Sequence, residues 1–229
     1  WVNRRLLVHL ILILILGASQ GVLGWYMVKS GLVDNPDVSQ YRLTAHLGVA
    51  FLIFGYMLWM GLSCLKGGGT KLNIISPKLL IGIVFAVFWI FLTMLSGGFV
   101  AGLDAGLTYN TFPMMDGQLI PKGLWNISPW YMNFFENVTT VQFDHRLLAK
   151  VTLLFVCVLW VTSRKTTMAN SSRKLFNALL IMVLIQVMLG VITIVFIVPV
   201  FFASLHQVGA IILFTIALWT THHLLYGGK

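Results

Sequence analysis

Charged residues, and acids in particular, are scarce in this sequence. Only 9% of the 229 residues are charged, with 6 Asp and Glu against 15 Lys and Arg. Soluble proteins carry about 25% charged residues, so this chain could not cover a water-exposed surface. Two cysteines and the absence of a long polar tract exclude a disulfide scaffold, a zinc ribbon and a disordered chain. The 59% hydrophobic content instead predicts an all-α protein that crosses a membrane several times.

Six apolar stretches have the length that a membrane-spanning helix needs. A hydrocarbon core of about 30 Å requires about 20 such residues in a helix. The stretches are 6–28, 43–65, 79–100, 143–161, 175–198 and 203–225. We therefore predict six transmembrane helices, which place both ends of the chain on the same side of the membrane.

The charge distribution predicts the orientation. Ten of the fifteen basic residues fall on one side of the predicted spans, whereas all six acids fall on the other. The ten are Arg4, Arg5, Lys66, Lys71, Lys78, Arg164, Lys165, Arg173, Lys174 and Lys229. Basic loops stay on the side of synthesis, so we expect both termini in the bacterial cytoplasm or the mitochondrial matrix. The net charge of +9 thus indicates membrane topology, with lipid as the partner and no nucleic acid.

Two segments of the chain resemble each other. Both contain Gln-x-x-Leu-Gly, at 20–24 and at 186–190, and then a histidine at the start of the next span, His46 or His206. A tryptophan follows each histidine by thirteen residues. The two segments begin on the same side, so this is a parallel repeat whose unit is four helices.

The repeat predicts one complete four-helix bundle plus half of a second, repeat-related bundle. We assign residues 1–66 to the latter helix pair of an N-terminal half and 67–78 to a basic inner loop. Residues 79–229 form the complete C-terminal half, with an outer loop at 101–142. The missing helix pair is expected upstream or on another chain.

His145 and His206 form the strongest candidate site. Both lie at the outer end of a predicted span and at the same depth, on alternate helices of the complete bundle. Two imidazoles that face each other inside a helical bundle are the usual axial ligands of a low-spin haem. The sequence has no Cys-x-x-Cys-His, so such a haem would be held without a covalent bond.

His46 is the repeat counterpart of His206, and its own partner histidine would lie on an absent helix. This predicts one complete haem site and half of another. Arg146, Lys150 and Arg42 lie near the same depth and are candidate partners of haem propionates. The alternative for any single histidine is a helix cap or a bond to a carbonyl group. The remaining histidines are interpreted as interfacial residues: His9, His222 and His223.

The glycines at 98, 102 and 106 are spaced by four residues, which lets either a neighbouring helix or a flat cofactor approach the backbone closely. The stretch 110–113 predicts the end of helical structure, because the residue before a proline avoids the helical region. The aromatic residues of the long loop beyond it suit a segment on the membrane surface.

Several stretches together resemble the haem A synthase family, in its mitochondrial and proteobacterial form. They are QGVLGWYMVKSGL, YRLTAHLG, GGFVAGLDAGLTYNTFPMMDG, FENVTTVQFDHRLLAK and LHQVGA. The resemblance implies eight helices in two four-helix halves. It also implies oxidation of a methyl group of haem O to the formyl group of haem A, the cofactor of cytochrome c oxidase.

The resemblance implies roles for the histidines. His145 and His206 would ligate a haem b, and His46 would be one of two axial ligands of the substrate haem. The family's second helix carries a Glu three residues before its His, but the only parallel here is Gln142, which cannot ionise. The catalytic carboxylate is therefore expected outside this chain. Haem O synthase, cytochrome c oxidase assembly factors and a second copy of the chain are candidate partners.

Two other functions fit parts of the pattern. A b-type haem subunit that transfers electrons without oxidation chemistry explains the histidine pair equally well. It explains the stretch GLDAGLTYNTFP and the incomplete repeat less well. A transporter or assembly scaffold without a cofactor explains the parallel repeat. However, the charges within the spans gather near the outer surface rather than at the membrane midplane.

Overall fold

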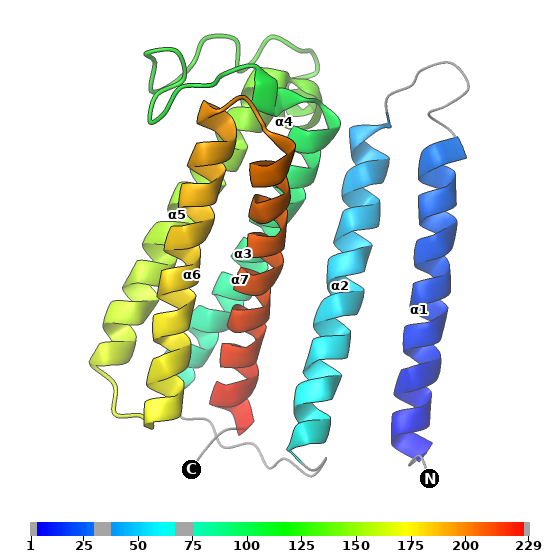
Figure 1. Cartoon of the computed structure of the whole chain (residues 1–229), viewed down its shortest axis with the longest axis vertical. Helices are drawn as coiled ribbons and strands as arrows, with labels where there is room; N and C mark the ends of the chain where they lie inside the picture. The colour runs from blue at the N-terminus through cyan, green and yellow to red at the C-terminus, as the bar shows by residue number, and fades with distance from the viewer. Residues whose placement is uncertain (1–3, 30–37, 67–75, 227–229) are drawn as a thin grey trace.

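The computed structural model describes residues 4–29, 38–66 and 76–226, and these are almost entirely helical (Figure 1). Six of the helices are long and apolar enough to cross a membrane. They are α1 (Arg4–Lys29), α2 (Gln40–Leu65), α3 (Pro77–Gly102), α5 (Val138–Arg164), α6 (Asn170–Val195) and α7 (Val200–Tyr226). The prediction of an all-α membrane protein with six spans is confirmed. Some predicted features lie outside the described residues: Asp34, Asp37, Lys71, Lys229 and most of the loop 67–78.

The long loop between α3 and α5 contains three short helical segments, η1 (Ala105–Leu107), η2 (Trp130–Met132) and α4 (Asn133–Glu136). The end of the molecule that carries this loop is called the loop end, and the opposite end, where α1 begins and α7 ends, is called the basal end (Figure 1). The predicted break at 110–113 is confirmed, since no helix covers these residues.

A side-chain cap and the backbone conformation of a turn determine where two of the helices begin or end. The side chain of Asn137 accepts hydrogen bonds from the backbone N–H groups of Thr139 and Thr140, at 3.0 and 3.3 Å. This N-cap satisfies donors that the first helical turn leaves unpaired, so α5 begins at Val138 rather than at the predicted 143. At the other boundary, positive φ angles of Ile197 and Val198 turn the chain sharply from α6 into α7.

Four of the long helices close into a ring. α3 packs against α5 and α7, and α6 packs against the same two helices. α2 lies against α3 and α7 outside this ring, and α1 packs against α2 (Figure 1). The chain thus pairs a ring of four helices with a separate helix pair, α1 and α2.

Glycines let α2 come close to α3. A Cβ atom on Gly102 would lie 2.6 Å from the Cα atom of Gln40, and one on Gly98 would lie 2.9 Å from Oγ1 of Thr44. A Cβ on Gly106 would meet Val198 at 2.9 Å. Of the two interpretations of these glycines, the structure therefore supports protein packing rather than approach of a flat cofactor.

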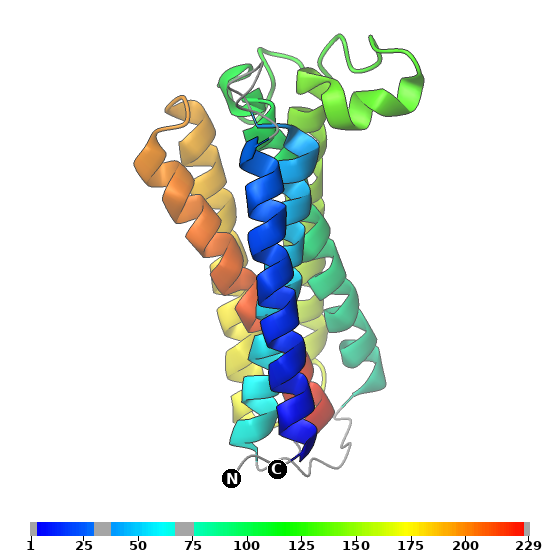
Figure 2. The ribbon, with the colours of Figure 1, turned by 90° about the vertical axis from the view of Figure 1, so that its right-hand side faces the viewer.

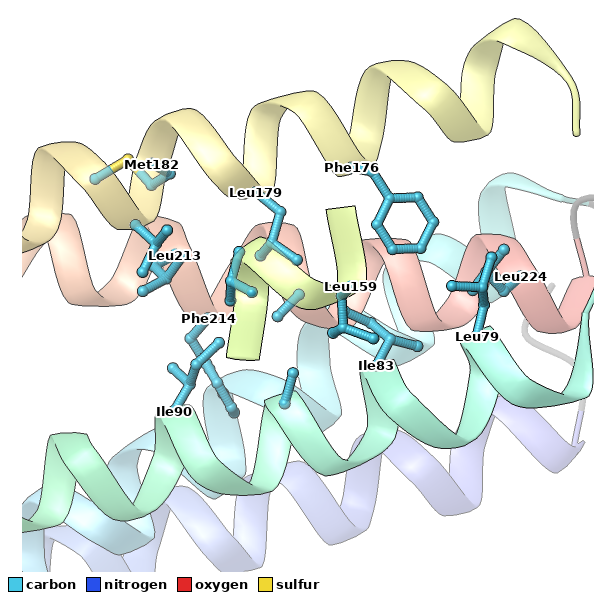
Figure 3. Close-up of a cluster of buried hydrophobic side chains, with 14 of the residues drawn as sticks. Leu79, Ile83, Ile90, Leu159, Phe176, Leu179, Met182, Leu213, Phe214 and Leu224 are labelled. Atoms are coloured by element: carbon cyan, nitrogen blue, oxygen red, sulfur yellow. The ribbon is translucent and has the colours of Figure 1, made fainter. Parts of the chain in front are cut away.

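The hydrophobic core fills the basal part of the ring and extends as far as Met94 on α3 and Met182 on α6. Its fully buried side chains come from all four ring helices and include Leu79, Ile83, Leu159, Phe176, Leu179, Leu213 and Leu224 (Figure 3). Towards the loop end, α6 and α7 lean away from the other helices (Figure 2). The core cluster extends on α7 from Leu213 to Leu224, so it stops before the loop-end turns of that helix.

Candidate functional site

His145 of α5 and His206 of α7 come together at the loop end, beyond the hydrophobic core. Their ring centres are 6.4 Å apart and their planes are nearly perpendicular, at 86°. Two metal–imidazole bonds of about 2 Å each, together with the two ring half-widths, amount to about 6 Å between ring centres. The spacing therefore fits one metal ion held between the two rings.

His145 is held by two neighbouring residues of α3. Its Nδ1 atom lies 2.8 Å from the hydroxyl oxygen of Ser96. Its Cε1 atom lies 3.3 Å from the position that a Cβ on Gly97 would occupy. The ring thus lies against a backbone without a side chain, and the Nδ1 contact leaves Nε2 as the nitrogen for a ligand.

His206 is held in a similar way by α6. The amide nitrogen of Gln186 donates to the backbone carbonyl of His206 at 2.9 Å and lies 3.2 Å from Nδ1 of its ring. A Cβ on Gly190 would come within 2.9 Å of the ring. The Gln-x-x-Leu-Gly sequence therefore supplies both contacts, a glutamine for the backbone and a glycine for the ring.

His46 repeats these contacts in the other helix pair. Gln20 of α1 donates to the carbonyl of His46 at 2.7 Å, and a Cβ on Gly24 would lie 3.2 Å from the His46 ring. The sequence repeat thus corresponds to the same local geometry. His46 is the only histidine of the described segment 38–65, so this segment offers no second imidazole to pair with it.

Buried polar atoms near these histidines lack partners in the described part of the chain. They are Nδ1 of His46 and Oε1 of both Gln20 and Gln186. An unpaired buried polar atom costs about 1–3 kcal/mol and is common where a ligand or cofactor contributes contacts. The described residues also contain no group of three or more His, Cys, Asp or Glu that could hold a bare metal ion.

Taken together, these features fit a haem between His145 and His206. The two imidazoles have the required spacing, and glycines let each ring lie close to the backbone of the preceding long helix. Both histidines remain partly exposed within the chain. Two imidazoles complete the coordination of a porphyrin iron, whereas a bare metal ion would need further ligands.

Arg146 and Gln142 of α5 form hydrogen bonds to the outer loop. The Arg146 guanidinium donates to the carbonyls of Thr111 and Tyr109, at 2.8 and 2.6 Å. Gln142 is fully buried and donates to the carbonyls of Ala105 and Tyr109, at 2.7 and 3.2 Å. The structural role of Gln142 was not predicted from the sequence. Much of the donor capacity of Arg146 is used by the loop, and contact with a propionate stays a prediction.

Arg42 lies with His46 and not with the pair in the ring. Its guanidinium stacks over the Tyr26 ring at 4.5 Å and lines a cavity of about 160 Å³ between α1 and α2. Lys150 lines a second cavity of about 150 Å³, beside Arg146 and the outer loop. The predicted cations are therefore distributed over both helix groups, each within two helical turns of a histidine in sequence.

The interfacial interpretation is wrong for His222. Its side chain is 1% exposed, and its Nε2 atom lies 3.1 Å from the hydroxyl of Ser63 on α2. The ring also contacts Trp59 edge to face, with centres 5.0 Å apart. Because α2 packs against α7, a residue that the sequence places at the membrane surface is buried between two helices.

Comparisons with known proteins show the family of this chain. Residues 1–218 match the COX15-CtaA family model, which is described as cytochrome oxidase assembly protein. The chain belongs to this family. Among curated relatives, it is 51% identical to "Heme A synthase" of Nitrosospira multiformis and 44% identical to that of Parvibaculum lavamentivorans. Each alignment covers 97% of this chain and 63% of the relative.

A relative from an animal is also similar. "Heme A synthase COX15" of Bos taurus is 42% identical over 98% of this chain and 56% of its own length. The chain thus spans less than two thirds of the curated relatives that it matches.

Proposed function

We propose that the protein is a haem A synthase, an oxidoreductase that converts a methyl group of haem O to the formyl group of haem A for cytochrome c oxidase. One observation carries the proposal. The contacts that hold His206 recur at His46, so the chain has a complete histidine pair and a second, repeat-related histidine. A simple electron-transfer subunit with one haem has no need for the second position.

In this proposal, residues 79–229 are an electron-transfer half. His145 and His206 would hold a haem b through their imidazole nitrogens, and a haem held by two histidines would supply electron transfer rather than oxygen chemistry. Conversion of a methyl to a formyl group with water as the oxygen source releases four protons and four electrons, so the electrons must pass from the substrate site to an external electron acceptor. Gln142 lies three residues before His145 in this electron-transfer half. It cannot act as an acid or base for the reaction, because it is not ionisable and its amide donates to two loop carbonyls.

The helix pair α1 and α2 contributes to the substrate side. His46 is proposed as one axial ligand of the substrate haem, and Arg42, one turn earlier on α2, as a partner of its propionates. Arg146, the residue after His145, is proposed as a propionate partner beside the haem b site. The protein itself supplies ligands, orientation and shielding, while the haem supplies the redox chemistry when it is bound.

The proposed setting is the bacterial plasma membrane or the mitochondrial inner membrane, with the basal end on the cytoplasmic or matrix side. Arg164, Lys165, Arg173 and Lys174 all lie at the basal end, as expected for the side of synthesis. Haem O synthase, which would supply the substrate, cytochrome c oxidase assembly factors and a second copy of the chain are the proposed protein partners.

The haem b assignment is tested by removing one ligand of the pair. We expect His206→Ala in the native protein to abolish the low-spin b-type spectrum, because one of two axial bonds to the iron is lost. His223→Ala is the matched control, since this histidine lies at the basal end, bonded to Ser171. The measurements are the visible spectrum and the haem-to-protein ratio of the purified protein. An unchanged spectrum in His206→Ala would overturn the assignment.

Co-expression with a source of haem O separates the candidate reactions. A haem A synthase should form haem A, which extraction and mass spectrometry detect. A low-spin haem b without haem A formation would favour the electron-transfer subunit instead. Purified protein with no Soret absorption would favour the scaffold or transporter.

A further inference from the structure

Ser96 has a hydrogen-bonding arrangement that favours one tautomer of the His145 ring. Its hydroxyl oxygen lies 2.7 Å from the backbone carbonyl oxygen of Thr93 and 2.8 Å from Nδ1 of His145. A serine hydroxyl has a single hydrogen to donate, and a carbonyl oxygen can only accept. The hydrogen must therefore point at Thr93, because otherwise two oxygen atoms would face each other at 2.7 Å without a hydrogen between them.

The Ser96 oxygen is then an acceptor towards His145. A close contact between this oxygen and Nδ1 is favourable only if Nδ1 carries a hydrogen. In a neutral imidazole with Nδ1–H, the other nitrogen, Nε2, has the free lone pair that binds a metal ion. We propose that Ser96 is a positioning residue that selects this tautomer of His145 and strengthens it as a haem ligand.

The consequence is a difference between the two axial ligands. An acceptor at Nδ1–H orients a ligating imidazole and makes it a stronger electron donor to the metal. A stronger donor stabilises ferric over ferrous iron and so lowers the reduction potential. Ser96 contacts the His145 ring, whereas the His206 ring lies against Gln186 and Gly190 of α6. Ser96 should therefore influence the potential through His145 alone.

This inference rests on the proposed haem b site, and a graded series at one position tests it. In the native protein, Ser96→Ala removes the acceptor, Ser96→Cys replaces it with a weaker one, and Ser96→Thr restores a hydroxyl. We expect Ser96→Ala to raise the midpoint potential and to weaken haem binding by about 10- to 100-fold, the usual effect of losing a contact to a metal ligand. The cysteine variant should lie between alanine and wild type, and the threonine variant near wild type.

Ser163→Ala is the matched control. Ser163 is buried in α5 and donates to the carbonyl of Trp160 at 2.6 Å, the same contact along the helix as in Ser96. The readouts are spectroelectrochemical titration and haem retention. If Ser96→Ala binds no haem while Ser96→Thr does, the inference is supported as well.

The outcomes separate the two proposals. A wild-type protein without a low-spin haem would overturn the proposed function and this inference together. A wild-type haem whose potential and retention are unchanged in Ser96→Ala would overturn this inference alone. An equal change in Ser163→Ala would also overturn it, because the effect would then come from helix packing.

Discussion

Each of the three loop-end histidines lies against a glycine of the preceding long helix, namely Gly24, Gly97 or Gly190. A hydrogen in place of a side chain lets the imidazole approach the helix backbone closely. Any larger residue would have to push the ring away, since a Cβ on each of these glycines would lie only 2.9 to 3.3 Å from a ring carbon atom. The glycines therefore set where each imidazole can be.

Gly190→Ala tests this at the tightest contact. Alanine is the better helix former by about 1 kcal/mol, so the helix itself should not be weakened. We expect a displaced His206 ring and a reduced haem-to-protein ratio, measured by absorption of the purified protein. Gly21→Ala is the control, because a Cβ there meets no atom within 4 Å. Equal haem content in both variants would contradict the proposed role of Gly190.

At the scale of secondary-structure elements, hydrogen bonds attach the outer loop to α5. Gln142 and Arg146, one turn apart, bond to carbonyls of the segment 105–111. Asn110 of that segment also donates to the carbonyl of Ile194 on α6. The loop therefore connects two helices of the ring beside the histidine pair, although it contains little helix of its own.

Gln142→Leu should loosen this attachment. Leucine has a similar size but cannot donate, which leaves two carbonyls without that partner and costs about 1–3 kcal/mol in unfolding free energy. We expect a lower unfolding temperature in detergent and faster proteolysis within 103–132. Gln207, which is exposed on α7 and lies outside the loop, changed to Leu is the control. Wild-type stability of Gln142→Leu would show that the buried amide does not hold the loop.

At the scale of the whole molecule, the chain separates into the ring and the α1–α2 pair. His145 and His206 belong to the ring, and His46 lies in the pair, held by α1 rather than by any ring helix. The two histidine positions thus depend on different helix contacts. The proposed electron-transfer and substrate functions should be separable by mutation.

His46→Ala should abolish haem A formation but retain the low-spin spectrum of the His145–His206 haem. His9→Ala is the control on the same helix pair, since His9 is bonded to Tyr56 near the basal end, away from His46. Haem extraction and visible spectroscopy of the same preparations give both readouts. Loss of both signals in His46→Ala would show that the two sites are not independent.

Sequence patterns predicted the six spans well because an apolar run of membrane length has few alternatives to a helix. The start of α5 was missed by five residues, since it depends on the side-chain cap of Asn137. Depth along the spans was enough to pair His145 with His206. It could not predict Ser96, because its contact requires the rotation of α3 relative to α5.

The sequence by itself determined the helical class, the number of spans and the depth of each histidine, because these follow from residue order and the thickness of a membrane. Only the tertiary structure decided which faces meet. It buried His222 between α2 and α7, directed Gln142 to loop carbonyls and placed Ser96 against His145. Such contacts depend on how the helices pack and rotate against one another, and hydrophobic runs this long carry little information about rotation.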